Sequence, residues 1–171
     1  MNAMSKVGNA SNFGRRLKDQ HFSSKIQNIK QLASLGFDDE AFKELAQIQR
    51  MKNLTVMQSV QIADCLYKLG KFEECLKALR PLEDQIDTTS SKMVNEKLVL
   101  FNMLGIVYRA LGKEELAVMN WKECLVINSR YTIALNNLGN HFMHAHEYLN
   151  AAKCYWRSKK CTLCFTRLRQ T

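Results

Sequence analysis

The sequence predicts an all-α protein built from repeated helical hairpins, and three observations support this fold class. Apolar residues recur at steps of three and four along residues 98–130, which is the period of an α-helix and not of a strand. The same pattern returns at a fixed shift, from Gly105 to Gly139, and self-similarity at one period is typical of a repeat array. One proline and seven glycines in 171 residues leave too few turn signals for an all-β protein.

Length and hydropathy set the broad class. A chain of 171 residues is long enough for about one domain with a real core, and its apolar content of 46% is ordinary for a water-soluble fold. No apolar run approaches the roughly 20 residues that a membrane-spanning helix needs, so we expect no membrane span.

The best-defined hairpin covers residues 98–131, where two apolar helical faces meet at a turn around Gly112. The small Gly105 leaves room for a neighbouring helix, and Trp121 is large enough to fill the gap between the two arms. A second copy covers residues 132–165. The residues that repeat at the fixed shift are Phe101, Leu104, Gly105, Tyr108, Ala117 and Trp121 in the first copy, and Leu135, Leu138, Gly139, Phe142, Ala151 and Tyr155 in the second.

These two segments, F-x-x-L-G-x-x-Y…A-x-x-x-W and L-x-x-L-G-x-x-F…A-x-x-x-Y, resemble tetratricopeptide repeats. Phe101 and Leu135 stand where the family often has Trp, and the closing proline of the family pattern is absent from both copies. The resemblance implies a right-handed superhelical array of three to four antiparallel helical hairpins, an α-solenoid.

Two further hairpins precede this pair. Residues 56–86 form a clearer copy, and Pro81 should break or kink its second helix because proline lacks a backbone donor and clashes with the preceding turn. Residues 21–55 form a hairpin around Gly36, which precedes Gly70 by one repeat period. Ile29 occupies its small-residue position, so this hairpin is either a degenerate repeat or a cap on the array. Together the hairpins define a repeat domain over residues 21–165.

The remaining segments read as connections and tails. Residues 1–20 mix Gly, Asn, Ser and basic residues, which predicts a disordered basic N-terminal tail, with a mitochondrial transit peptide as the alternative. Residues 87–92 predict a long polar loop, and residues 166–171 a basic C-terminal tail. The last helix should run from about Tyr148 to Lys160. No further helix is long enough to cap the array, so this end is either short and frayed or meets another chain.

The net charge of +9 is concentrated at the two ends of the chain. Residues 1–35 carry six basic residues against one acidic residue, and residues 132–171 carry the same balance. Basic ends suit nucleic acid, an acidic protein or an anionic membrane surface. The alternative is a solvated face with a disordered tail.

No motif predicts an enzyme or a cofactor. The chain has no Gly-rich phosphate loop, no G-x-S-x-G and no H-E-x-x-H. Three His residues lie near Cys161-x-x-Cys164, but no second Cys pair stands at the usual distance, so we expect no metal site. The six Cys do not form a disulfide framework, and Cys75 and Cys124 occupy small buried positions of the repeat. A reducing compartment, the cytoplasm, therefore fits best, with mitochondrial import as the alternative.

The resemblance implies that the first helix of each hairpin lines a groove that holds a peptide. Asn side chains there both donate and accept hydrogen bonds, Arg109 suits a carboxylate, and Met side chains form an adaptable floor. The alternative is that these positions only cover the helices or pack on a terminal segment. The predicted peptide-binding residues are Gln61, Tyr67, Asn102, Met103, Arg109, Asn137, Asn140, Met143 and His144.

The predicted function is therefore a non-enzymatic scaffold or adaptor, which binds a protein segment in the groove or docks as a subunit of a larger multi-protein complex. The two-carboxylate clamp of heat-shock co-chaperones is excluded, because the inward positions that would need Lys, Asn and Arg include Val60, Asp64 and Met103. The alternative function is an RNA-binding repeat protein that uses the basic ends. Base stacking requires exposed aromatic rings, and the groove positions offer only Tyr67.

Overall fold

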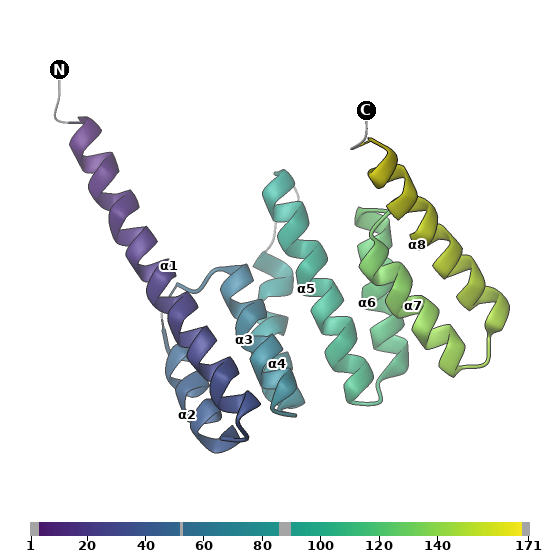
Figure 1. Cartoon of the computed structure of the whole chain (residues 1–171), viewed down its shortest axis with the longest axis horizontal. Coiled ribbons are helices and arrows are strands. Elements are labelled where there is room, and N and C mark those ends of the chain that lie inside the picture. Colours follow the sequence, from purple (N-terminus) through teal and green to yellow (C-terminus); the bar gives the residue numbers. More distant parts are fainter. Residues whose placement is uncertain (1–3, 52, 86–89, 169–171) are drawn as a thin grey trace. The chain divides into compact units, whose positions relative to one another are not determined.

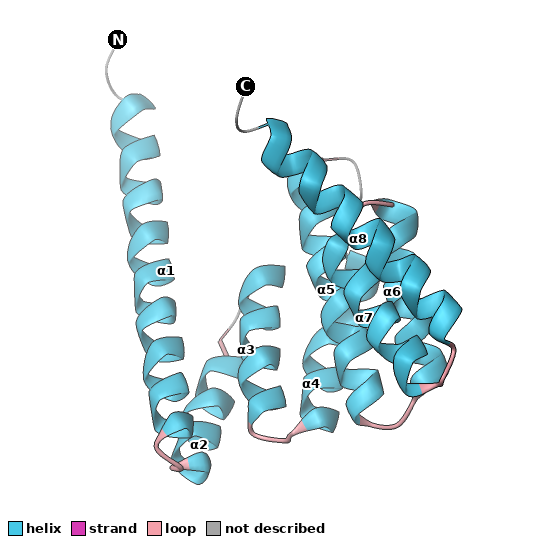
Figure 2. Ribbon diagram, turned by 45° about the vertical axis from the view of Figure 1, so that its right-hand side comes forward, coloured by secondary structure: helices cyan, strands magenta, loops and turns pink. Residues whose placement is uncertain are grey.

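The computed structural model describes residues 4–51, 53–85 and 90–168. Over these residues the chain consists of helices and turns, with no strand (Figures 1 and 2). The predicted all-α class is confirmed. The chain divides into two compact units, residues 1–71 and 72–171, which we describe separately.

The first unit contains one helical hairpin and a third helix that packs on both of its arms. The chain reverses at Gly36, whose φ of +83° lies in the left-handed region that glycine adopts without strain. Ile29, Leu45 and Ile48 are fully buried in this unit. The helices are α1 (Met4–Ser34), α2 (Asp38–Gln49) and α3 (Val56–Lys68).

The second unit contains two antiparallel hairpins, α5 with α6 and α7 with α8 (Figure 1). Helix α7 also packs on α6, and α4 packs on α5. Helix α4 ends at Leu79 and a 3-10 helix follows through Pro81, so the predicted break at this proline is confirmed. The elements are α4 (Phe72–Leu79), η1 (Arg80–Gln85), α5 (Ser91–Ala110), α6 (Glu114–Ile127), α7 (Thr132–His144) and α8 (Tyr148–Leu168).

The helices extend further than the sequence predicted. Residues 4–20, predicted to be disordered, belong to α1, and residues 161–168 continue α8 beyond Lys160. Helix α5 begins at Ser91, so part of the predicted loop 87–92 is helical. The physical reason is that elongating an existing helix adds one hydrogen bond per residue, and none of these segments contains a proline. Residues 1–3, 87–89 and 169–171 of the predicted tails and loop lie outside the described residues.

The closest helix packing in the second unit occurs at two glycines. A Cβ atom at Gly105 would lie 2.4 Å from Nε1 of Trp121, and one at Gly139 would lie 2.6 Å from Cε1 of Tyr155. Both distances are too short for any side chain, so each ring rests on bare helix backbone. Trp121 is fully buried, and its Nε1 has no hydrogen-bond partner. The predicted roles of Gly105 and Trp121 are confirmed.

The two earlier repeats carry a different pair of residue types at the equivalent sequence positions. Ile29 and Leu45 occupy these positions in the first repeat, and Ala63 and Leu79 in the next. All four side chains are fully buried. Where the first position has a side chain, the second is therefore an aliphatic residue, and where the first is glycine, the second is an aromatic ring.

The thiol of Cys124 is part of the same core as Trp121. It is fully buried, as predicted, and its Sγ donates to the carbonyl oxygen of Leu98 at 3.4 Å. Desolvation by burial raises the pKa of Cys124 from 9.0 to about 12, because the thiolate would lose its hydration. Burial also raises the pKa of Cys65 and of Cys154.

The ring-on-glycine packing can be tested by a double-mutant cycle. Trp121→Ala should lower the free energy of unfolding by about 3–5 kcal/mol, and Gly105→Ala by about 1–3 kcal/mol, because the first leaves a cavity and the second overpacks the site. In the double variant Gly105→Ala with Trp121→Leu, the smaller Leu side chain leaves room for the added Cβ atom, so the double variant should cost about 1 kcal/mol less than the sum of Gly105→Ala and Trp121→Leu. Denaturant unfolding measures each value. Val126→Ala, on an exposed side chain, is the control; a loss under about 1 kcal/mol for Trp121→Ala would contradict this packing.

The buried thiol predicts how stability depends on pH. Since the folded pKa of Cys124 lies above its ordinary value of 9.0, its contribution is complete below pH 9 and declines as pH rises toward 12. The decline approaches about 1.4 kcal/mol per pH unit within that window. Urea unfolding of the natural chain and of Cys124→Ala, at matched pH values between 7.5 and 10.5, should show a difference in stability that shrinks above pH 9. A constant difference would mean that Cys124 is not desolvated.

Candidate functional site

In the second unit, α5 and α7 place the predicted binding residues at matching intervals. Asn102 and Arg109 are seven residues apart on α5, and Asn137 and His144 are seven residues apart on α7. Seven residues are about two helical turns, so each pair shares one face of its helix and spans roughly 10 Å.

The two Asn side chains form a pair between these helices. Nδ2 of Asn137 donates to Oδ1 of Asn102 at 2.8 Å, and the bond is partly buried. Among the described residues, the amide NH₂ of Asn102 and the Oδ1 of Asn137 make no other hydrogen bond. The pair therefore presents one donor group and one acceptor, which is the complement of a peptide unit.

A hollow of about 290 Å³ lies near the other end of this face. It is lined by Arg109, Glu114, His141, His144 and Ala145. Oε2 of Glu114 lies 2.9 Å from Nδ1 of His141, which ties the start of α6 to α7. Arg109 is half-buried and makes no ion pair with any described residue, so its guanidinium is available for a carboxylate.

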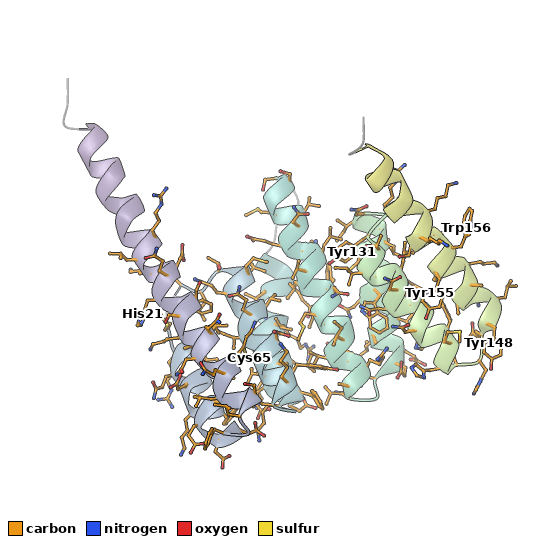
Figure 3. The ribbon with its side chains drawn as sticks, viewed as in Figure 1. His21, Cys65, Tyr131, Tyr148, Tyr155 and Trp156 are labelled. Carbon is orange, nitrogen blue, oxygen red and sulfur yellow. The ribbon has the colours of Figure 1, made fainter. Side chains whose placement is uncertain are left out.

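Two predicted groove residues are already engaged inside the unit. Met103 is only 7% exposed, so it offers almost no surface to a groove and the prediction that it lines one was wrong. Asn140 is exposed, but its Oδ1 accepts from the hydroxyl of Tyr155 at 2.6 Å, on the side of α7 that faces α8 (Figure 3). Met143 is exposed, and its part in peptide binding remains a prediction.

The remaining predicted residues lie on α3 in the first unit. Gln61 is exposed and Tyr67 is half-buried, and their part in peptide binding remains a prediction. A hollow of about 300 Å³ in this unit borders Lys30, Cys65 and Lys68. Asp64 pairs with both lysines, at 3.6 and 3.1 Å, so two ammonium groups share one carboxylate.

Glu114 was not predicted as a site residue. It lies on the second helix of its hairpin, whereas the repeat pattern directs attention to the first. No periodic signal marks Glu114, because it comes close to His141 and Arg109 only after α5, α6 and α7 have packed together.

The described side chains include no cluster of three or more residues that could hold a metal ion. The side chains of Cys161 and Cys164 lie outside that set. Within the part of the chain searched, no helix is both long enough and apolar enough to cross a membrane.

Comparison with solved structures identifies proteins with a similar fold. The crystal structure of MamA, a tetratricopeptide-repeat protein, superimposes with a TM-score of 0.63 at 13% sequence identity, over 98% of each chain. The chain has a tetratricopeptide-repeat fold. The MamA RS-1 ArsTM double mutant matches with a TM-score of 0.37 and 11% identity, over 82% of this chain and 96% of that one. No protein-family model matches the sequence, and no curated protein matches it. At 13% identity the similarity supports the fold alone, and any function has to be argued from the residues of the site.

The amide pair can be tested by stability measurements alone. Asn102→Ala and Asn137→Ala each remove one partner of a partly buried hydrogen bond, so the two losses should not add. We expect a coupling free energy of about 0.5–1.5 kcal/mol in denaturant unfolding of the two single variants and the double variant. Strict additivity would show that the two side chains do not contact one another in solution.

Proposed function

We propose that this protein is a non-enzymatic scaffold that binds an extended acidic protein segment along α5 and α7 of its second unit. The observation that carries the proposal is the Asn102–Asn137 amide pair, about two helical turns from the unpaired guanidinium of Arg109. The tetratricopeptide-repeat fold supports the protein-binding class, because such arrays expose long helical faces to partners.

The geometry specifies the bound segment. The Asn pair holds one peptide unit of the segment through its free donor and free acceptor, whatever the side chain at that place. Arg109 lies roughly 10 Å further along α5, which an extended chain spans in about three residues. The segment should therefore carry Asp, Glu or a terminal carboxylate about three residues from the anchored peptide unit. We further propose that the partner belongs to a multi-protein complex in the cytoplasm.

Fluorescently labelled ten-residue peptides test this proposal by anisotropy. In one series a single Glu moves one position at a time along an otherwise neutral sequence. Arg109→Met should weaken the best acidic peptide at least about tenfold, because a charge-assisted bond is lost, and should leave its Gln counterpart unchanged. Asn102→Ala with Asn137→Ala should weaken both peptides, since backbone contacts do not depend on the side chain.

The control variant is Lys113→Gln, which removes an exposed positive charge at the α5–α6 turn without touching the proposed face. It should bind like the natural chain. Equal affinity for the Glu and Gln peptides, or binding that survives all three site substitutions, would refute the proposal. A single-stranded RNA probe in the same assay, released by moderate salt in place of any peptide binding, would favour the RNA-binding alternative.

A further inference from the structure

A carboxylate lines the same hollow as Arg109 without pairing with it. Arg109, near the end of α5, and Glu114, at the start of α6, both border the hollow of about 290 Å³. Opposite charges that share one hollow attract each other, and a change of side-chain rotamer can bring the two groups together. Arg109 nevertheless makes no ion pair with any described residue. Another group must therefore hold Glu114 away from the guanidinium.

His141 of α7 is that group. Its Nδ1 lies 2.9 Å from Oε2 of Glu114, and because a carboxylate only accepts hydrogen bonds, Nδ1 is the donor. The side chain of His141 is 19% exposed, whereas that of Glu114 is 50% exposed. The imidazole is therefore the more firmly held partner, and it fixes where the more exposed carboxylate lies.

Helix stacking in this unit does not require the pair of Glu114 and His141. One repeat earlier, the position of His141 is held by Val107, which is fully buried. One repeat later, the position of Glu114 is held by Tyr148, which carries no charge. A half-buried imidazole costs stability relative to an apolar side chain unless it is hydrogen-bonded. The pair is therefore particular to one junction between hairpins, and packing alone does not explain it.

We propose that Glu114, held by His141, restricts the Arg109 hollow to a single carboxylate and excludes a phosphorylated side chain. This inference rests on the proposed peptide site. One carboxylate neutralises the guanidinium of Arg109 and brings no further charge. A phosphorylated side chain carries a charge of about −1.5 to −2 at pH 7, so its excess negative charge faces the carboxylate of Glu114. The bound segment should therefore carry Asp, Glu or a terminal carboxylate that phosphoserine cannot replace.

His141 is a positioning residue in this proposal, because it acts through Glu114. While its Nδ1–H holds the Glu114 carboxylate, Arg109 stays open to a ligand. Without that donor, we expect Glu114 to pair with Arg109 and to close the hollow to every anion. A purely structural tie between α6 and α7 predicts a different result, since losing the tie would lower stability and leave the choice between carboxylate and phosphate unchanged.

Peptide selectivity is measured by anisotropy with the whole 171-residue chain and three labelled ten-residue peptides. The peptides carry Glu, Gln or phosphoserine at the position that suits Arg109 best and are otherwise identical. The natural chain should bind the phosphoserine peptide at least about tenfold more weakly than the Glu peptide. Glu114→Gln should raise the affinity for the phosphoserine peptide at least about tenfold, and that for the Glu peptide by less. Glu115→Gln removes the next carboxylate of α6, which does not border the hollow, and should change neither affinity.

Variants of His141 separate positioning from a purely structural role. His141→Leu should weaken the Glu peptide at least about tenfold, because Glu114 then occupies Arg109. Adding Glu114→Gln should restore binding of the Glu peptide. His141→Asn keeps an N–H donor close to the place of Nδ1 and should bind like the natural chain. A structural tie does not predict rescue by Glu114→Gln, since that substitution cannot rebuild the lost contact.

A measurement without peptide follows the Arg109 guanidinium itself by NMR. Exchange of its Nε–H with water should slow in His141→Leu, because the new ion pair shields the proton, and should return to the natural rate when Glu114→Gln is added. Acetate and inorganic phosphate serve as probes in the same spectra. Acetate should shift the Arg109 signal of the natural chain, whereas phosphate should shift it comparably only in Glu114→Gln.

The outcomes distinguish this inference from the proposed peptide site. If the Glu peptide binds but the phosphoserine peptide binds as tightly, or if His141→Leu leaves binding unchanged, the inference is overturned and the peptide site is retained. If no peptide binds the natural chain, the peptide site is refuted and the Arg109 signal decides. No response of that signal to His141→Leu, or equal responses to phosphate and acetate, would then overturn the inference as well, whereas the expected responses would support it.

Discussion

The second unit depends on one contact, the indole of Trp121 against the bare backbone at Gly105. The ring lies 2.4 Å from where a Cβ would stand, so α5 and α6 can pack at this close spacing only because residue 105 is glycine. That spacing sets the position of Glu114, at the start of α6, relative to Arg109, near the end of α5. The hollow that these residues share is therefore a consequence of core packing.

The next hairpin also packs an aromatic ring on a glycine, but the ring differs in its chemistry. Tyr155 rests on Gly139 as Trp121 rests on Gly105, but its hydroxyl reaches the surface and donates to Asn140. Trp121 is enclosed completely and its indole N–H finds no partner. An unsatisfied buried donor costs roughly 1–3 kcal/mol, so the contact is stabilising only because the burial of the ring and its fit to the glycine outweigh that cost.

Two surfaces of the second unit differ in what they offer a partner. The α5 and α7 face is polar, with hydrogen-bonding capacity left by the Asn102–Asn137 pair and one unpaired guanidinium. The exposed side of α8 carries Tyr148, Leu149 and Trp156, and the helix contains no Asp or Glu. The first suits an extended backbone, as proposed above. The fold alone does not predict what this unit binds, because tetratricopeptide-repeat arrays differ in the residues that they present.

The sequence by itself determined the local structure of this protein. Helical periodicity, the fixed repeat period, the turn at Gly36 and the break before Pro81 all follow from spacing and backbone chemistry within a few neighbouring residues. Burial of Trp121 followed as well, because its position in the repeat is shared by every copy. The extents of α1 and α8 were underestimated, since helix elongation needs no apolar stripe once a packed segment has nucleated it.

Only the tertiary structure decided which side chains meet. Met103 was predicted to line a groove from its place in the repeat, yet it is only 7% exposed in the packed unit. The pairing of Asn102 with Asn137, and of Glu114 with His141, joins residues 27 to 35 positions apart on different helices. A repeat period specifies which face a residue occupies, but a hydrogen bond depends on the rotation and spacing of two helices to within less than an ångström. Those quantities come from the packing of rings on glycine, and no local pattern contains them.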